Sequence, residues 1–194
     1  DVPIDQSYIK IAKVGRCYLD TDAFIAVTHF KGHGMTSFGG ALKNIGMGCA
    51  TRAGKLAQHC DTVPTYYEDK CIGCGECEKV CPVEAIHMEN DKSILSKAKC
   101  IGCASCVGVC PDNALFVDLE VGDEIQKKMV EYAYAVLKSK KGRACFLNFA
   151  LRINKECDCW PFENERIAPD VGIFASTDPV AIDKASVDLV NKAE

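Results

Sequence analysis

The sequence lacks any apolar run long enough to cross a membrane, and we expect no charged-then-apolar leader. It also lacks an excess of basic residues, because 27 Asp and Glu residues outnumber 23 Lys and Arg residues and give a formal net charge of -4. An acidic balance argues against nucleic acid as a partner. We therefore expect a cytoplasmic protein with neither a nucleic-acid nor a membrane partner, and the sequence carries no signal for its oligomeric state.

The sequence also lacks the glycine motifs that bind nucleotide phosphates. Residues 31–49 contain six of the 15 glycines, but they match neither the dinucleotide fingerprint nor the phosphate loop that ends in Gly-Lys-Ser/Thr. Glycine at this density allows positive φ angles and a close approach of the backbone to a ligand or another strand. Residues 31–49 are therefore predicted to form a glycine-rich loop that approaches a ligand or another part of the chain.

Cysteine, in contrast, is abundant, with 14 in 194 residues. Eight of these cysteines lie between Lys70 and Asp118, in two copies of the run Cys-x-x-Cys-x-x-Cys-x-x-x-Cys-Pro. This run is the bacterial signature for a pair of 4Fe-4S clusters, in which the fourth cysteine of each run binds the other cluster. The predicted ligands are Cys71, Cys74, Cys77 and Cys110 for one cluster, and Cys100, Cys103, Cys106 and Cys81 for the other.

The two runs are copies of one pattern, spaced 29 positions apart, and apolar residues repeat together with the cysteines. Ile72 matches Ile101, and Val80 matches Val109. Zinc or disulfide bonds are the alternative interpretation, but neither requires two full copies of this run followed by proline. Residues 70–118 closely resemble the bacterial-type 2x4Fe-4S ferredoxins. The resemblance implies single-electron transfer, because a cluster held by four cysteines has no open iron site.

Outside residues 70–118, the apolar patterns predict strands alternating with helices. Phe24–Phe30 is a continuous apolar run, which is typical of a strand buried on both faces of a parallel sheet. Asp123 and Asp178 are predicted to cap helices, with Pro179 in the first turn of the second helix. The predicted apolar face of the helix after Asp123 consists of Ile125, Met129, Tyr132 and Val136. The other predicted elements are strands at residues 8–14, 145–151 and 171–175 and a helix at residues 50–59.

These elements predict a protein of the α/β class. Its architecture is expected to be a layered sheet-and-helix host domain with an inserted ferredoxin-like (α+β) two-cluster module. The predicted boundaries are residues 1–66 for the first part of the host domain, 67–118 for the insert and 119–194 for the second part of the host domain.

A second group of polar residues follows the predicted strands. In an open parallel sheet, ligands bind beyond the carboxyl ends of the strands. Three sets of residues occupy those ends: His29, Lys31 and His33; Cys157 and Cys159; and Ser176, Thr177 and Asp178. A parallel sheet would bring the three sets to one edge. The catalytic candidates among them are Lys31, His33, Cys157 and Cys159, and a Cys-x-Cys pair can supply metal ligands, a redox couple or part of a third cluster.

Three stretches outside the cysteine runs resemble a known family. They are the glycine-rich stretch from His29 to Lys55, the run Glu156-Cys-Asp-Cys-Trp160, and the stretch from Asp170 to Asp183. Together with the cysteine runs, they resemble the uncharacterised iron-sulfur centre proteins. These form a bacterial and archaeal domain-of-unknown-function family in which a two-cluster ferredoxin module interrupts a larger domain. The resemblance implies this architecture and a longer parent protein, and it leaves the reaction open.

Three functions are compatible with these patterns. The first is a cytosolic iron-sulfur protein of anaerobic metabolism that passes single electrons to or from a site in the host domain or a redox protein partner. The second is an iron-sulfur oxidoreductase that acts on a small-molecule substrate at the glycine-rich loop. In this second reading Lys31 and His33 bind an anion or donate protons, and Cys157 or Cys159 is a metal ligand or redox thiol. The third is an interaction module that the clusters stabilise, as structural zinc does.

Overall fold

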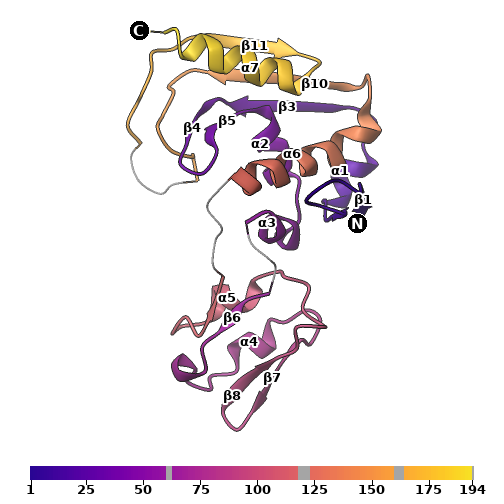
Figure 1. The fold of residues 1–194 in the computed structure, drawn as a ribbon, viewed down its shortest axis with the longest axis vertical. Helices are drawn as coiled ribbons and strands as arrows, with labels where there is room; N and C mark the ends of the chain where they lie inside the picture. The colour runs from indigo at the N-terminus through magenta and orange to yellow at the C-terminus, as the bar shows by residue number, and fades with distance from the viewer. Residues whose placement is uncertain (60–62, 118–122, 160–163, 194) are drawn as a thin grey trace. The chain divides into compact units, whose positions relative to one another are not determined.

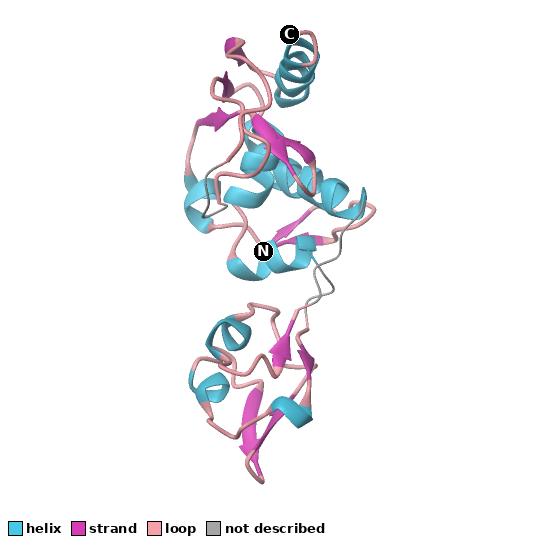
Figure 2. Ribbon diagram, turned by 90° about the vertical axis from the view of Figure 1, so that its left-hand side faces the viewer, coloured by secondary structure: helices cyan, strands magenta, loops and turns pink. Residues whose placement is uncertain are grey.

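The computed structural model describes residues 1–59, 63–117, 123–159 and 164–193 (Figure 1). The described residues combine α-helices with small β-sheets, in agreement with the α/β prediction (Figure 2). They divide into two compact units, residues 1–51 with 121–194 and residues 52–120. The boundaries expected from the sequence, 66/67 and 118/119, differ from those of the compact units, 51/52 and 120/121.

The first unit is built on a three-stranded sheet in the order β11-β10-β3. β10 (Ala144–Ala150) runs parallel to β3 (Phe24–His29) and antiparallel to β11 (Gly172–Ser176). The strands predicted at 24–30, 145–151 and 171–175 are therefore confirmed to within about a residue at each end. The sheet is therefore mixed: β3 and β10 are parallel, but the carboxyl end of β11 lies at the opposite edge, so the condition for all three predicted sets to meet at one edge is not fulfilled.

Three helices share a core with one face of this sheet. They are α2 (Ala41–Gly48), α6 (Asp123–Leu137) and α7 (Pro179–Val190). Ile45 of α2 and Ile182 of α7 belong to the same buried cluster as Phe146 of β10. The predicted apolar face of α6 is confirmed, since all four of its members are at most 3 % exposed. Burial of such side chains contributes about 1.5–3 kcal/mol each to folding. The cap predicted at Asp123 depends on a side chain that lies outside the described part of the structure.

The second face of the sheet remains open to solvent in the described residues. Side chains alternate along a strand, and on β3 the alternation leaves Ile25 70 % and Val27 60 % exposed. Ile173 on β11 is 58 % exposed. The prediction that Phe24–Phe30 is buried on both faces is therefore wrong, because the three helices pack against only one face of the sheet.

The N-terminal segment forms less strand than its apolar pattern predicts. β1 (Val2–Pro3) pairs with β2 (Ile11–Ala12), so the expected strand at residues 8–14 is reduced to two residues. The backbone N–H groups of Tyr8 and Ile9 donate to the carboxylate of Glu131 on α6, at 3.2 and 2.6 Å. Because α6 takes these donors, they are not available for pairing with a neighbouring strand. The short helix α1 (Arg16–Asp20) follows.

The glycine-rich stretch is a hairpin followed by a helix, and the prediction of a continuous loop is wrong. β4 (Lys31–His33) pairs with β5 (Ser37–Gly39), and α2 begins directly afterwards. The expected close approach of backbone is present, since a Cβ on Gly32 would lie 2.3 Å from the carbonyl oxygen of Lys155. The expected positive φ angles are absent from the glycines of residues 31–49. At Gly32, glycine is therefore required because a side chain would collide with the backbone of Lys155, and not because of the backbone conformation.

The last helix begins as predicted. The carboxylate of Asp178 accepts hydrogen bonds from the backbone N–H groups of Val180 and Ala181, at 2.8 and 3.0 Å. Pro179 occupies the first turn, where its missing N–H costs nothing. The cap and proline predicted from the sequence are therefore confirmed.

The second unit contains two small antiparallel pairs and several short helices. β6 (Thr65–Tyr66) pairs with β9 (Leu115–Phe116), and β7 (Ile86–Glu89) pairs with β8 (Lys92–Leu95). The helices of this unit are α3 (Arg52–His59), the 3₁₀-helix η1 (Glu68–Lys70), α4 (Glu76–Lys79) and α5 (Ser105–Val109). A second 3₁₀-helix, η2 (Lys138–Lys140), follows α6 in the first unit. α3 confirms most of the helix predicted at residues 50–59. The core of the second unit is formed by Cys77, Ile86, Cys106 and Leu115.

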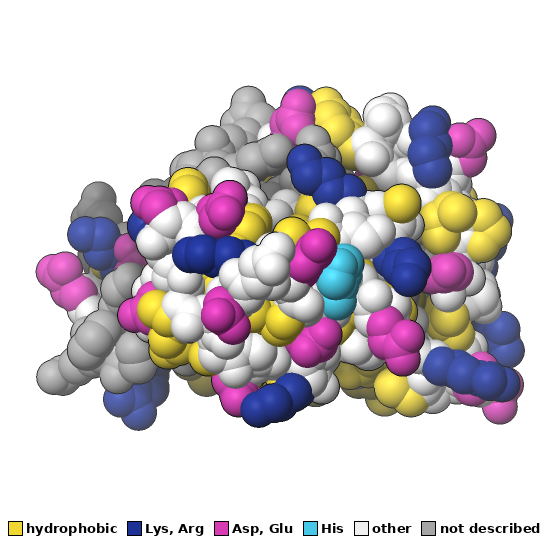
Figure 3. Space-filling view, turned by 90° about the horizontal axis from the view of Figure 1, so that it is seen from below, with side chains coloured by type: hydrophobic (Ala, Val, Ile, Leu, Met, Phe, Trp, Pro, Cys, Tyr) yellow, Lys and Arg dark blue, Asp and Glu magenta, His cyan; other side chains and the backbone are white. Residues whose placement is uncertain are grey.

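The described surface gives two further facts. Among the described residues, no helix combines the length and apolar character that a membrane span requires. On the face drawn in Figure 3, the described Lys and Arg side chains are interspersed with Asp and Glu side chains. This face therefore shows no continuous basic patch among its described residues.

Candidate functional site

Two cavities in the second unit are lined by cysteines. The first cavity is lined by Cys71, Cys74, Cys77 and Cys110, with Ile72, Pro111 and Leu115 among its apolar walls. The second is lined by Cys81, Cys100, Cys103 and Cys106, with Pro64, Ile86 and Ile101 among its walls. Each cavity has an empty volume of about 320 Å³, including space open to solvent. Each thus has three cysteines from one run and the fourth from the other, which are the two sets expected from the sequence.

Repeated local structure positions these cysteines. Gly75 and Ala104 are equivalent in the two runs, and both adopt a left-handed conformation, with φ of 74° and 55°, directly before α4 and α5. The reversal turns the chain into each short helix, whose buried third cysteine, Cys77 or Cys106, faces the cavity of its own run. The fourth cysteine of each run follows the helix and lines the other cavity.

Backbone N–H groups point at several of the thiols. Ala85 N donates to Cys81 Sγ at 3.1 Å, and the equivalent Ala114 N donates to Cys110 Sγ at 3.2 Å. Gly102 N donates to Cys100 Sγ at 3.4 Å. Hydrogen bonds to sulfur favour the thiolate, which is the form that binds metal. The backbone therefore prepares these sulfurs for an electropositive ligand.

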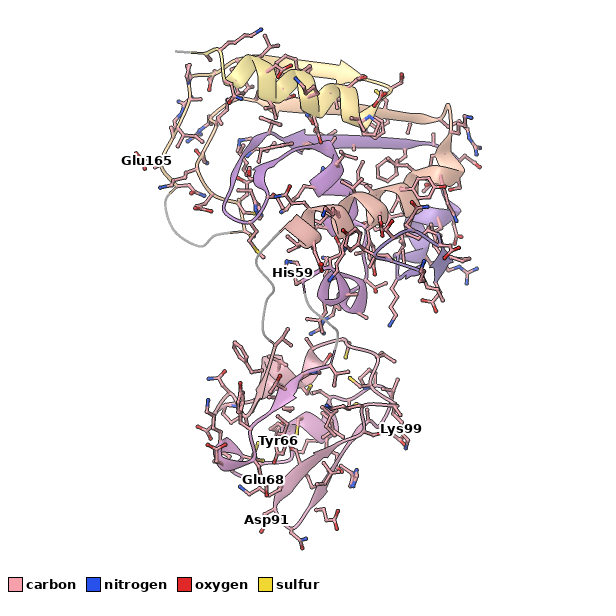
Figure 4. All side chains as sticks on the ribbon, in the orientation of Figure 1. His59, Tyr66, Glu68, Asp91, Lys99 and Glu165 are labelled. Carbon is pink, nitrogen blue, oxygen red and sulfur yellow. The ribbon has the colours of Figure 1, made fainter. Side chains whose placement is uncertain are left out.

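The environments of the thiols shift their pKa values in different directions. Burial raises the pKa of Cys71, but hydrogen bonds from Tyr66, Gly73 and Ser93 outweigh it and bring the pKa to about 7. Tyr66 is labelled in Figure 4, and burial and the contact with Cys71 raise its own pKa to about 12. Burial raises the pKa of Cys106 to about 11. A buried thiolate of this kind needs a compensating cation, which the iron of a cluster would supply.

The donor sets fit an iron-sulfur cluster. Four thiols surround each cavity, apolar side chains line its walls, and N–H groups face the sulfurs, which are the features that hold such clusters. Among the described residues, no three His, Cys, Asp or Glu side chains are close enough together to hold a single metal ion.

A second group of reactive side chains lies in the first unit, where the β4–β5 hairpin meets the loop after β10. Lys43 Nζ lies 3.5 Å from Cys157 Sγ, and the backbone N of Cys159 lies 3.5 Å from the same sulfur. Lys31 Nζ lies 3.0 Å from the carboxylate of Asp158. Lys31, Cys157 and Cys159, three of the four catalytic candidates, thus come together, joined by Lys43 and Asp158. We call these five residues the thiol–lysine group.

Electrostatics separate the two thiols of this group. Burial raises the pKa of Cys157, but hydrogen bonds from Cys159 and the nearby Lys43 and Lys31 outweigh it, so the net shift is downward. The pKa of Cys159 is raised, chiefly by its hydrogen bond with Cys157. Of the two thiols, Cys157 therefore ionises more readily than Cys159. Burial raises the pKa of Asp158, but His29 and Lys31 lower it further than burial raises it.

His29 anchors the same loop through both ring nitrogens. Nδ1 lies 3.0 Å from both carboxylate oxygens of Asp158, and Nε2 lies 2.9 Å from the carbonyl oxygen of Leu151. Both partners are acceptors, so both hydrogen bonds form together only when both ring nitrogens carry a proton. His29 therefore holds this loop at two points, Leu151 and Asp158.

Other predicted members of this edge lie elsewhere. His33 Nδ1 accepts a hydrogen bond from the backbone N of Met35, at 3.2 Å, within its own hairpin. Ser176, Thr177 and Asp178 follow β11, which is antiparallel, so their predicted convergence with His29 is wrong. Asp178 is the cap of α7.

The sequence did not single out Lys43 and Asp158. Lys43 reaches Cys157 because α2 starts immediately after the hairpin, and this helix was not predicted. Asp158 had a usable signal, because it is the charged residue between two cysteines of an otherwise polar loop. Its partners His29 and Lys31 lie more than 120 positions away, and a local pattern cannot indicate such contacts.

Comparisons with known proteins support the class that the cysteines indicate. Short stretches of the chain are 62 % identical over 26 residues to "Ferredoxin-2" of Desulfomicrobium norvegicum, and 60 % identical over 25 residues to the "Ferredoxin" of Mycolicibacterium smegmatis and that of Saccharopolyspora erythraea. Each match covers 13 % of this chain, and the matches span 44 %, 24 % and 24 % of the three ferredoxins. These matches suggest an iron-sulfur protein with an electron-transfer role.

One family model matches nearly the whole chain. Residues 1–188 match the model of the family described as "Domain of unknown function (DUF362)". The chain therefore belongs to the DUF362 family.

Proposed function

We propose that this protein binds two 4Fe-4S clusters in the two cysteine-lined cavities and uses them to pass single electrons. The observation that carries the proposal is the lining of the cavities, each with three cysteines from one run and the fourth from the other. This crossed arrangement is how two-cluster ferredoxins hold their clusters. The short matches to ferredoxins support the same class.

The chain's residues define what such clusters can do. Four thiolates per cluster leave no open position on iron, so the bound group supplies reversible one-electron chemistry. Buried apolar walls such as Leu115 and Ile86 limit the access of water, and the N–H groups that face the sulfurs stabilise the reduced, more negative state. Hydrogen bonding and burial therefore set the potentials of the two sites.

We further propose that residues 52–120 act as a ferredoxin-type insert within a larger domain. The flanking segments, 1–51 and 121–194, form one compact unit, as expected if the second unit interrupts it. The electrons would pass to or from a site in the first unit or a redox protein partner, in the cytoplasm of an organism with anaerobic metabolism.

A reductase activity is the second candidate function. The observation that favours it is the thiol–lysine group, in which Lys43 and Lys31 lower the pKa of the Cys157 thiol in the first unit. Such a group can bind an anionic small molecule or react through sulfur. Two electron-carrying clusters in the same chain would give this site a source of electrons.

A redox titration followed by electron paramagnetic resonance tests the main proposal. Anaerobically purified protein should give reduced-cluster signals that appear and vanish reversibly as the potential is stepped down and up. Cys17→Ser serves as the control, because Cys17 is exposed and lies outside both cavities. Clusters that stay silent across the accessible range would contradict electron transfer and favour the role of structural staples.

A further inference from the structure

Two of the six thiols outside the cysteine runs, those of Cys157 and Cys159, are in contact with each other. Cys157 and Cys159 share a side-chain hydrogen bond, and Cys157 Sγ also accepts from the backbone N of Cys159 at 3.5 Å. Cys159 is exposed and Cys157 is half-buried. One sulfur is thus sheltered beside its partner, and the partner faces solvent.

A cation lies beside the sheltered sulfur. Lys43 Nζ on α2 is 3.5 Å from Cys157 Sγ, and Lys31 is close enough to lower the pKa of the same thiol. A neighbouring ammonium group favours the thiolate, which is the nucleophilic form of cysteine. Lys43 favours the thiolate of both cysteines, but it contacts the sulfur of Cys157, and the pKa of Cys159 is raised overall by its hydrogen bond with Cys157.

The loop that carries both thiols is held at several points. The carboxylate of Asp158, between the two cysteines, pairs with Lys31 and His29 at 3.0 Å. The side chain of Asn164 accepts from the backbone N of Glu156 at 3.2 Å and donates to the carbonyl oxygens of Glu156 and Cys157 at 3.3 Å. The central residue and the backbone are therefore anchored, which keeps the two sulfurs together.

We infer that Cys157 and Cys159 form a thiol–disulfide exchange site, with Cys157 as the attacking thiolate, Cys159 as the resolving thiol and Lys43 as the residue that stabilises the thiolate. The co-reactant is a disulfide. The inference does not depend on the clusters, because its chemistry uses only these two thiols and an external disulfide.

The exchange proceeds in two balanced steps. The Cys157 thiolate attacks one sulfur of the external disulfide, forms a mixed disulfide and releases the first thiolate. Cys159 then loses its proton to solvent and attacks Cys157 Sγ, which forms the Cys157–Cys159 disulfide and releases the second thiolate. The chain's two thiols are oxidised by two electrons, and the external disulfide is reduced by two.

A single tryptic peptide reports the reaction. Residues 156–166 lie between the cleavage sites Lys155 and Arg166 and contain both thiols and no other cysteine. Anaerobically purified holoprotein would be treated with oxidised glutathione, alkylated and digested for mass spectrometry. We expect this peptide to lose two hydrogens and to escape alkylation. A peptide that remains alkylated at both cysteines, or keeps glutathione on both, would overturn the inference.

Variants assign the roles of the two thiols. Cys159→Ser should accumulate glutathione on residue 157, because no resolving thiol remains, whereas Cys157→Ser should form adducts at least tenfold more slowly. Equal rates in the two variants would contradict the assignment. A bound metal ion beyond the cluster iron that is lost in Cys157→Ser would show that the thiols are metal ligands, and this too would overturn the inference.

Lys43 is proposed to act through Cys157, and variants that remove or keep its positive charge test this role. Lys43→Gln should slow adduct formation at pH 7 by about threefold to tenfold, because a smaller thiolate fraction is only partly offset by higher nucleophilicity. Lys43→Arg should restore most of the rate, because arginine keeps the positive charge. If the role of Lys43 were purely structural, the rates of the two variants would not differ according to charge. A urea unfolding transition like that of wild type shows that the first unit is folded in both variants, and equal rates for Gln, Arg and Lys at this position would contradict the role of Lys43.

Discussion

At the scale of single residues, the carboxylates of Asp183 and Asp158 differ in burial and in the contacts that they make. Asp183 is 3 % exposed and accepts hydrogen bonds from the backbone N–H groups of Ala41 and Leu42, at 2.7 and 2.9 Å, and from Asn148 Nδ2 at 2.8 Å. It therefore caps α2 from α7 and joins both helices to β10. Asp158 is half exposed and holds the loop with the two thiols.

Removal of the buried carboxylate should destabilise the first unit. In Asp183→Ala, the donors of Ala41, Leu42 and Asn148 lose their acceptor in a buried site, and each such loss costs about 1–3 kcal/mol. We expect the free energy of unfolding in urea to fall by about 3 kcal/mol. The matched control is Asp188→Ala on the same helix, whose exposed ion pair with Lys184 is worth less than about 1 kcal/mol. Equal losses in the two variants would contradict the network.

Asp158 gives a prediction for pH. Its pKa is lower in the folded protein, so it adds stability above its unfolded pKa of about 3.9, and this stability is lost as the pH falls through the lowered folded pKa. Because the carboxylate is half exposed, the contribution is about 1 kcal/mol or less. The difference in unfolding free energy between wild type and Asp158→Asn should shrink as the pH falls from 7 to 3. A difference that stays constant would show that the ion pairs do not contribute.

At the scale of elements, the sequence predicts best where one helix or strand has its own signal. The apolar face of α6 and the cap of α7 follow from local spacing and were confirmed. Residues 8–14 were overpredicted because their N–H groups bond to Glu131, a contact across the fold. α2 was hidden by its glycines, which disfavour a helix by about 1 kcal/mol each and are tolerated here because the helix packs against α6 and α7.

The contact between the β4–β5 hairpin and the loop after β10 depends on Gly32. Its N–H donates to the carbonyl oxygen of Asn154 at 2.8 Å, and a Cβ would lie 2.3 Å from the carbonyl oxygen of Lys155. We expect Gly32→Ala to cost about 1–3 kcal/mol of stability by forcing two backbones apart, and to reduce the reactivity of Cys157 by moving its loop. Urea unfolding and the glutathione assay measure the two effects.

The control for this element is another glycine. A Cβ on Gly48 of α2 would meet only Asn44 Oδ1, at an ordinary 3.7 Å. Gly48→Ala should therefore leave reactivity unchanged and stabilise the helix by up to about 1 kcal/mol. If Gly32→Ala behaved like Gly48→Ala, the close packing of the hairpin would not be required for the site.

At the scale of the whole molecule, the two sets of cysteines predicted as cluster ligands also line the two cavities, and their binding of clusters stays a prediction. The thiol–lysine group was predicted only in part. Its members come from three segments, and the prediction assumed a parallel sheet that β11 does not complete. Side chains brought together by tertiary contacts carry no joint pattern in the sequence, so Lys43 and Asp158 required the structure.

The central claim is that the two cavities of the second unit each hold a 4Fe-4S cluster. The most direct measurement is the content of iron and acid-labile sulfide in anaerobically purified protein. The account predicts about eight iron and about eight sulfide per chain, the content of two cubes with four of each. Protein that contains zinc without sulfide, or that contains about four iron and four sulfide, would contradict it.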